Sequence, residues 1–288
     1  MSEWVLGIIG GSGLYQLDML QDARWKTIDT PWGKPSDDLL VGKIGSVKCV
    51  FLPRHGRDHH IGPSQLNFRA NIDAMKQLGV TDLVSISAVG SLVEELPPGH
   101  FVAVDQFIDR TFAREKSFFG DGLVAHVSMA DPVCPRLSKF AADAAKNAGA
   151  NVHQGGTYLA MEGPQFSSRA ESHLYKQWGA HVIGMTAMPE AKLAREAELP
   201  YALIGMVTDY DCWRENEAPV EVEAVIAQLT ANATKARSLI VNLVQSLPNK
   251  RDASPIDTAL DFAIITAPKH RNSKATTKLR NIAGRVLS

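Results

Sequence analysis

The 288-residue sequence lacks several features that mark whole classes of protein. Its three cysteines, Cys49, Cys134 and Cys212, are far apart and odd in number, which speaks against a disulfide framework or a cysteine zinc site and favours a reducing compartment. The apolar run at residues 4–9 is too short for a membrane span and lacks the flanks of a signal peptide. We therefore expect a cytoplasmic protein without a membrane partner.

The sequence also has almost no net charge. Thirty Lys and Arg face 31 Asp and Glu, a balance of −1 at pH 7, so no bulk positive field is available to bind nucleic acid. The charge is uneven, because residues 249–288 hold eight basic and three acidic side chains and leave 22 basic and 28 acidic ones in 1–248. We expect a globular body over 1–248 and a basic extension over 249–288 that forms a surface helix or is partly disordered.

Short β-rich apolar segments alternate with helical ones along the body. The apolar pattern predicts strands at 5–9, 39–44, 47–52, 83–88, 101–107, 181–186 and 201–207. Apolar spacing and capping residues predict helices at 64–78, 131–149, 168–179, 189–198 and from 219 onward. This alternation indicates one α/β domain with a central, mostly buried sheet.

Two segments that follow strands are candidates for binding a phosphate. In Gly10-Gly11-Ser12-Gly13 the glycines let backbone N–H groups approach an anion and Ser12 adds a hydroxyl, although a tight strand-to-helix turn explains them equally well. Arg54 and His55 supply directional donors suited to a dianionic phosphate, with a solvated charged loop as the alternative. The adjacent His59 and His60 lack the spacing of metal ligands, so no metal site is expected.

Two further strand ends carry polar residues. Ser87 and Ala88 end the strand at 83–88, at the edge where α/β sheets usually bind ligands, although an ordinary loop is the alternative. Asp209, Tyr210 and Asp211 follow the strand at 201–207, where one carboxyl group can donate to a ring nitrogen and the other accept from an exocyclic amine. Donation near pH 7 requires burial or a neighbouring negative charge to raise a carboxyl pKa.

In combination these segments resemble the trimeric purine nucleoside phosphorylase family, and within it the branch that acts on 5′-methylthioadenosine. The resemblance covers most of 5–246. Its specific blocks are residues 7–14, 29–36, 54–57, 105–111, 162–171 and 208–213. It implies a catalytic domain over 1–248 with a mixed, partly barrel-like sheet flanked by helices.

The resemblance also implies a reaction and the residues that perform it. The reaction is the phosphorolysis of 5′-methylthioadenosine to adenine and 5-methylthioribose 1-phosphate, with phosphate as co-substrate and no cofactor. Phosphate would be held by Ser12, Arg54, His55, Ser87, Ala88 and Thr186. The nucleoside would meet Phe166, Met185, Asp209, Tyr210, Asp211, Val222, Val225, Ile226 and the partner subunit's His126, with Ser167 and Val222 tuning substrate choice.

Phosphorolysis makes chemical demands that these residues meet. Breaking the glycosidic bond builds positive charge on the ribose and negative charge on the purine, so phosphate stabilises the first and protonation of N7 the second. We assign Asp209 as the acid at N7 and Asp211 as the acceptor from the 6-amino group. Val225 and Ile226 suit a methylthio group, although helical spacing alone explains them as plain core. Gly184 stands where the family commonly has a larger polar residue.

Three alternatives remain open from the sequence. A 5′-methylthioinosine or 6-oxopurine nucleoside phosphorylase would share the fold, but an ionised Asp211 disfavours an oxo group. A nucleosidase using water would need a carboxylate base near the anomeric carbon in place of the anion site. A nucleoside sensor without catalysis would not need the acid at Asp209. The shared site with His126 implies a homotrimer.

Overall fold

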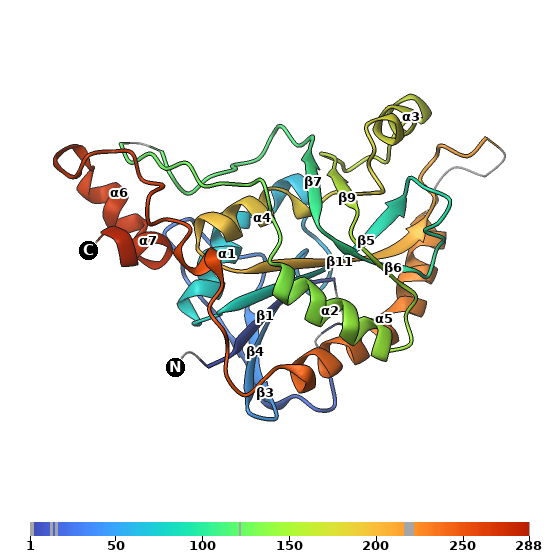
Figure 1. The fold of residues 1–288 in the computed structure, drawn as a ribbon, viewed down its shortest axis with the longest axis horizontal. Helices are drawn as coiled ribbons and strands as arrows, with labels where there is room; N and C mark the ends of the chain where they lie inside the picture. The colour runs from blue at the N-terminus through green and yellow to red at the C-terminus, as the bar shows by residue number, and fades with distance from the viewer. Residues whose placement is uncertain (1–2, 12–13, 15–16, 121, 216–221, 288) are drawn as a thin grey trace.

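Apolar strands form the centre of the molecule in the computed structural model, which describes residues 3–11, 14, 17–120, 122–215 and 222–287. In the described part they join one 11-stranded mixed sheet (Figure 1). The strands are β1 (Val5–Gly10), β2 (Gln21–Lys26), β3 (Leu39–Ile44), β4 (Val47–Pro53), β5 (Asp82–Ser91), β6 (Phe101–Val104), β7 (Gln106–Asp109), β8 (Val152–Gln154), β9 (Thr157–Ala160), β10 (Val182–Gly184) and β11 (Tyr201–Asp209).

The long strand β5 organises this sheet. Its first residues pair in parallel with β1, most of its length pairs in parallel with β11, and its end pairs antiparallel with β10. The sheet continues through β4, β3 and β2 on one side and through β9 and β7 on the other, while β6 and β8 extend from β11. The mixed α/β sheet expected from the sequence is confirmed.

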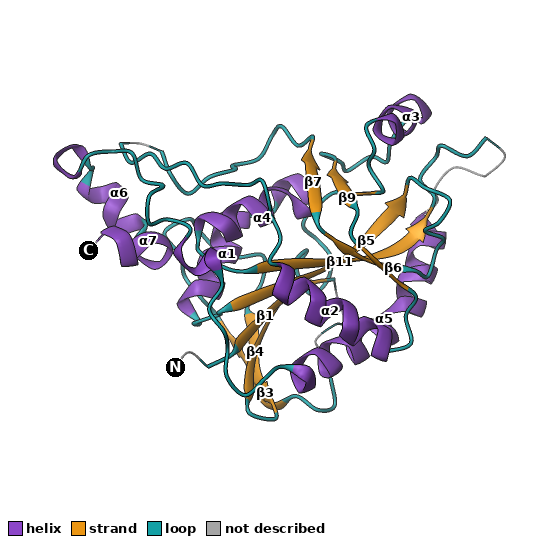
Figure 2. Cartoon of the chain, in the orientation of Figure 1, coloured by secondary structure: helices purple, strands orange, loops and turns teal. Residues whose placement is uncertain are grey.

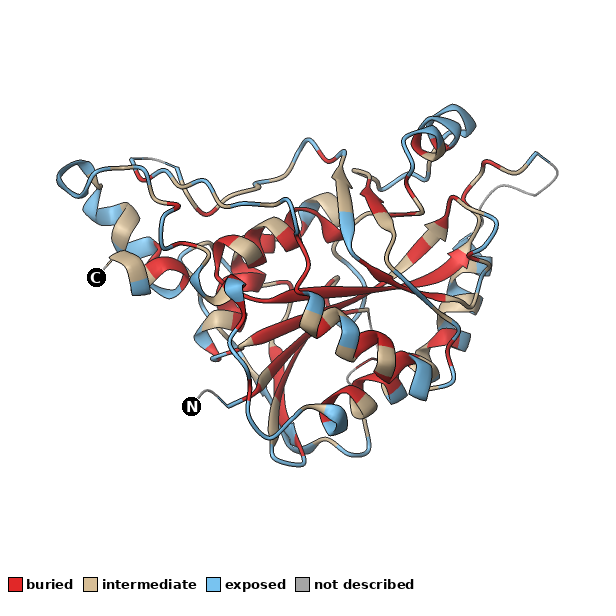
Figure 3. Cartoon of the chain, in the orientation of Figure 1, coloured by how far each residue is buried: buried red, intermediate tan, exposed pale blue. Residues whose placement is uncertain are grey.

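Helices cover both faces of the sheet (Figure 2). They are α1 (Phe68–Gln77), α2 (Pro135–Asn147), α3 (Arg169–Gln177), α4 (Ala187–Glu196), α5 (Val222–Ser246), α6 (Ser273–Lys278) and α7 (Arg280–Leu287), with short 3₁₀ turns at Pro63–Gln65, Pro255–Thr258 and Pro268–His270. Apolar residues of α1, α4 and α7 pack in one core and those of α2 and α5 in another. Neighbouring β5 residues alternate between these cores, with Leu83 in the first and Val84 in the second, so the sheet is buried on both sides (Figure 3).

Several element boundaries differ from the prediction. The expected strand at 101–107 is two strands, β6 and β7, interrupted at Asp105. Helix α2 begins at Pro135 after Cys134, because Pro135, not Pro132, occupies the first helical turn. The segment at 181–186 leaves the extended conformation after Gly184, and Thr186 is already the N-cap of α4. Strands β2, β8 and β9 were not predicted, since β2 is polar and the other two are short.

The basic extension over 249–288 packs against the body. Arg251 forms ion pairs with the buried Asp82 and with Asp257. Leu260 and Ile282 are buried in the core that contains α1. The segment around Ala263 also lies beside the loop of His126, whose N–H donates to the Ala263 carbonyl at 2.9 Å.

Candidate active site

One cavity of about 760 Å³ collects most of the predicted site residues at the carboxyl ends of β4, β5, β10 and β11. This is the edge at which parallel strands of α/β sheets bind ligands. Eleven of the predicted residues line the cavity: Arg54, His55, Ser87, Ala88, Phe166, Met185, Thr186, Asp209, Asp211, Val225 and Ile226.

The remaining predicted residues lie elsewhere. His126 lines a separate cavity of about 430 Å³ beside Lys192 and Glu196. Tyr210 packs its ring on the Arg214 guanidinium, and Val222 is 55% exposed at the start of α5. Ser167 lies near the cavity wall, where its hydroxyl approaches the Met161 sulfur at 3.8 Å. Ser12 lies outside the described residues.

Arg54 is already ion-paired within the protein. It is 2% exposed, and its Nε donates to Oε2 of Glu190 at 3.1 Å while Nη2 donates to Oε1 at 3.3 Å. Carbonyls of β1 and β5 accept further bonds from Nη2 and Nη1. Burial disfavours the charge, but the Glu190 carboxylate more than compensates and the pKa of Arg54 is raised. The fork expected to face phosphate is therefore occupied by Glu190, and at most one Nη1 N–H remains for a ligand.

His55 is a neutral acceptor at the same end of the cavity. Its Nδ1 lies 2.8 Å from the Ile61 carbonyl oxygen, which can only accept, so this contact assigns the proton to Nδ1. Burial, against the hydrogen bond to Ile61 and together with the charge of Arg54, lowers the pKa of His55 to about 4. The imidazole also stacks on His59 with 4.4 Å between ring centroids. Near pH 7, Nε2 therefore offers a lone pair and not a proton.

Two hydroxyl groups complete this end of the cavity. Ser87 and Thr186 are 7% and 5% exposed, and their hydroxyl oxygens lie 3.4 Å apart. Thr186 is the N-cap of α4, but within the described residues its side chain makes no capping hydrogen bond. The Ser87 and Thr186 hydroxyls together form a polar corner suited to an anion, referred to below as the anion corner.

Asp209 and Asp211 lie at the opposite end of the cavity. A register shift in the β5–β11 pairing precedes Asp209, whose Oδ1 accepts from the Asp211 N–H at 2.8 Å and whose Oδ2 accepts from the Thr208 hydroxyl at 2.7 Å. A Cβ at Gly90 would lie 2.8 Å from Asp209 Oδ1, so only glycine leaves room for this carboxylate.

Asp211 differs from Asp209 in its surroundings. It adopts a φ of +52° and is 7% exposed. Its buried Oδ2 finds no hydrogen-bond partner among the described residues. Burial raises the pKa of Asp211 and the charge of Asp209 also raises it, whereas the Ser172 and Ser167 hydroxyls beside it lower it. The carboxyl group lies at the wall of the cavity, where a ligand donor can reach it.

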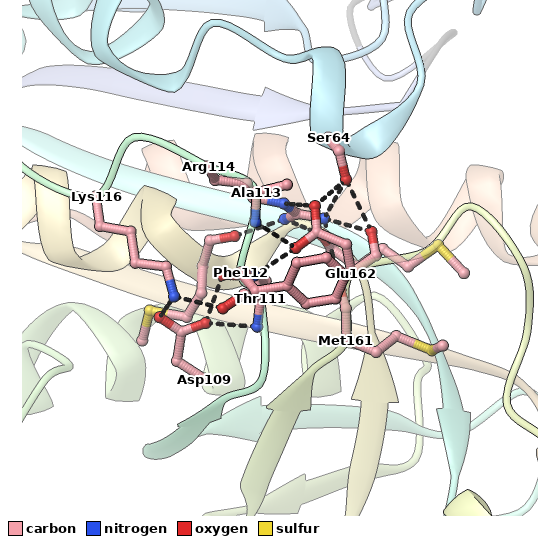
Figure 4. A network of polar contacts seen from close by, with 11 residues as sticks. Ser64, Asp109, Thr111, Phe112, Ala113, Arg114, Lys116, Met161 and Glu162 are labelled. Atoms are coloured by element: carbon pink, nitrogen blue, oxygen red, sulfur yellow. Dashed lines mark hydrogen bonds and ion pairs between the residues drawn. The ribbon is translucent and has the colours of Figure 1, made fainter.

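A buried polar network that the sequence did not reveal holds the segments around the cavity (Figure 4). Arg114 donates to the carbonyls of Glu162 and Met188 at 2.6 and 2.7 Å, and its Nη1 also donates to the Met185 carbonyl. The Glu162 carboxylate accepts from the backbone N–H of Phe112 at 2.6 Å. Because Met185 lines the cavity, this network fixes part of its wall.

Comparisons with known proteins agree with this geometry. The family model described as the phosphorylase superfamily matches residues 5–245. The chain belongs to the phosphorylase superfamily. The family resemblance inferred from the sequence motifs is thereby confirmed.

Individual members of the superfamily are similar over nearly the full chain. An S-methyl-5′-thioadenosine phosphorylase from Cereibacter sphaeroides is 58% identical over 98% of both chains, and one from Bradyrhizobium diazoefficiens is 55% identical over 100% of this chain and 99% of its own. The crystal structure of a methylthioadenosine phosphorylase from an antarctic soil metagenomic library superposes with a TM-score of 0.92 at 46% identity, covering 98% of this chain and 99% of that one.

A ligand-bound member of the superfamily is more distant. A mutant adenosine/methylthioadenosine phosphorylase from Schistosoma mansoni, in complex with methylthioadenosine, has a TM-score of 0.80 at 39% identity and covers 84% of this chain and 91% of that one. In the present superfamily member, no helix of the described residues is long and apolar enough to cross a membrane.

Proposed function

We propose that this protein catalyses the phosphorolysis of 5′-methylthioadenosine. A phosphate oxygen forms a bond to C1′ of the ribose as the bond from C1′ to N9 breaks, and adenine leaves with a proton on N7. The products are adenine and 5-methylthioribose 1-phosphate. The observation that carries the proposal is a single cavity with an anion corner at one end and a carboxyl pair at the other; the relatives named for this activity support it.

At the phosphate end we assign Ser87 and Thr186 as donors, joined by Ser12 and one N–H of Arg54. His55 accepts a hydrogen bond from the protonated oxygen of phosphate, since its Nδ1 is committed to the Ile61 carbonyl. This arrangement orients the anion mostly with dipoles, because the charge of Arg54 is balanced by Glu190.

At the base end we assign Asp209 as the general acid at N7 and Asp211 as the acceptor from the 6-amino group. The two carboxyl groups are neighbours at the cavity wall, which places an acid and an acceptor on the same side of a bound purine. The acceptor role of Asp211 favours adenine over hypoxanthine.

The methylthio group is proposed to lie against α5, where Val225, Ile226 and Leu229 give the cavity an apolar wall. Because His126 lies outside the cavity of its own chain, we propose that a homotrimer brings the partner subunit's His126 to this wall. The reaction would serve cytoplasmic purine and methionine salvage, since both products re-enter metabolism.

The decisive experiment measures release of base from 5′-methylthioadenosine, 5′-methylthioinosine, adenosine and inosine, with and without phosphate. We expect rapid phosphate-dependent release of adenine from methylthioadenosine and slower turnover of the inosine analogues. Equal rates without phosphate would instead identify a nucleosidase, and faster turnover of methylthioinosine would contradict the assignment of Asp211.

A further inference from the structure

Tyr158 lies directly behind the phosphate end of the cavity. It belongs to β9, is fully buried, and pairs in register with Val182 of the neighbouring strand β10. Its ring extends along β10 to Gly184, where a Cβ would lie 2.1 Å from Tyr158 Oη and 2.7 Å from Cζ. The phenol therefore occupies the space of the side chain that residue 184 lacks.

The hydroxyl of Tyr158 contacts the groups that form the anion corner. Tyr158 Oη accepts from the Thr186 N–H at 3.4 Å. Burial raises the pKa of Tyr158, opposed by hydrogen bonding with the backbone of Thr186 and the side chain of Ser87, so the phenol is neutral near pH 7. Both Ser87 and Thr186 line the cavity, and their hydroxyl oxygens are 3.4 Å apart.

We propose that Tyr158 is a positioning residue for the phosphate co-substrate, and that Gly184 is glycine to admit it. The Tyr158 hydroxyl fixes the Thr186 backbone and the hydroxyl pair of Ser87 and Thr186, which then face the anion in one arrangement. The inference rests on the proposed function, because it takes phosphate as the ligand of this corner. It also gives a physical reason for the glycine at 184, because any Cβ there would overlap the Tyr158 phenol.

The ring of Tyr158 contributes to core packing and its hydroxyl to the anion corner, so one substitution can separate the two roles. The ring packs edge to face on Phe107 at 5.9 Å between centroids, which is a contribution to the core. Tyr158→Phe retains that packing and removes only Oη. We expect the KM for phosphate to rise about 3- to 10-fold, the range of one neutral hydrogen bond, while the KM for methylthioadenosine changes less than twofold. The phosphate-induced rise in melting temperature should shrink in parallel.

Tyr175→Phe is the matched control, because it removes a hydroxyl from another largely buried tyrosine that lies outside the cavity lining. It should leave the KM for phosphate unchanged. An unchanged KM for phosphate in Tyr158→Phe, with wild-type turnover still dependent on phosphate, would overturn the positioning role while leaving the proposed function intact. Wild-type turnover without phosphate would overturn both.

Gly184→Ala tests the close contact between Gly184 and Tyr158 with a second variant, which is informative even if Tyr158→Phe fails to fold. Its Cβ would overlap both Oη and Cζ of Tyr158 and so displace the phenol from Thr186, and the KM for phosphate should rise by at least the same factor. In the double variant the two effects should not add, since both remove the same contact. Fully additive effects would show that Gly184 and Tyr158 act independently and would overturn the proposal.

Discussion

The two ends of the cavity treat buried charge in opposite ways. At the phosphate end, Arg54 is paired with Glu190 and His55 is held neutral by burial. At the base end, two aspartates lie side by side and one buried oxygen of Asp211 has no partner among the described residues. The charged groups of the proposed phosphate end are therefore neutralised within the protein, whereas the proposed base end keeps two neighbouring carboxyl groups. Removing a charge partner at the first end should mainly reduce stability, and substitutions at the second should reduce turnover and change selectivity.

The largest effect is expected at the base end from Asp209→Asn. The amide keeps the shape of the side chain but has no acidic proton for N7, so kcat should fall about 10²- to 10⁴-fold. Steady-state kinetics give kcat, and calorimetry should show that methylthioadenosine still binds. Asp143→Asn, which breaks an exposed ion pair with Lys139, is the control and should leave kcat unchanged. A loss of less than tenfold in Asp209→Asn would move the acid role to another group.

At the phosphate end, Glu190→Gln should mainly destabilise the fold. It leaves the Arg54 guanidinium buried without its carboxylate, and breaking such a pair costs about 3–5 kcal/mol of the free energy of unfolding. Urea unfolding measures the loss. Asp37→Asn breaks the more exposed pair with Arg57 and should cost less than about 1 kcal/mol. Equal losses in the two variants would contradict the distinction between a buried and a screened pair.

Sequence reasoning found the side chains that face the cavity far better than those that support it. Arg54, Ser87 and Asp209 each lie in or just after the last part of a recognisable strand, and the carboxyl ends of parallel strands meet at one edge. Glu190 was missed, because an acidic residue in a helix is typical of a solvent-exposed face. Arg114 was missed as well, because it lies in a segment without regular structure.

Short strands and contacts between distant residues were missed for a similar reason, because neither leaves a local pattern in the sequence. The strand of Tyr158 is only four residues long and gave no periodic signal, so its relation to Gly184 was invisible before the strands were paired. Arg54 lines the cavity as expected from the sequence, but its guanidinium is paired with Glu190, which is 136 residues away in the chain. Local sequence patterns indicate which side chains lie at the cavity. Contacts between distant parts of the chain decide which of those side chains already have a partner within the protein.

A third prediction concerns the neutral state of His55. Its pKa is about 4 in the folded protein against 6.5 ordinarily, so the folded state binds fewer protons than the unfolded state between these pH values. The resulting stability is fully present above pH 6.5 and is lost as the pH falls towards 4. Between pH 7.5 and 5 the loss is about 2 kcal/mol. His55→Gln should lack this component in urea unfolding at the two pH values, and an identical pH dependence in both proteins would contradict a buried neutral imidazole.

The smallest effect distinguishes the two aspartates at the base end from each other. Asp211→Asn places an amide donor where the unpartnered Oδ2 lies. A donor there favours a 6-oxo group, whereas the acceptor of the wild type favours a 6-amino group. The ratio of kcat/KM for methylthioadenosine over methylthioinosine should therefore fall about tenfold, the equivalent of one hydrogen bond exchanged. Because the variant keeps Asp209, kcat for the preferred base should fall much less than in Asp209→Asn. An unchanged ratio would mean that Asp211 supports Asp209 without reading the base.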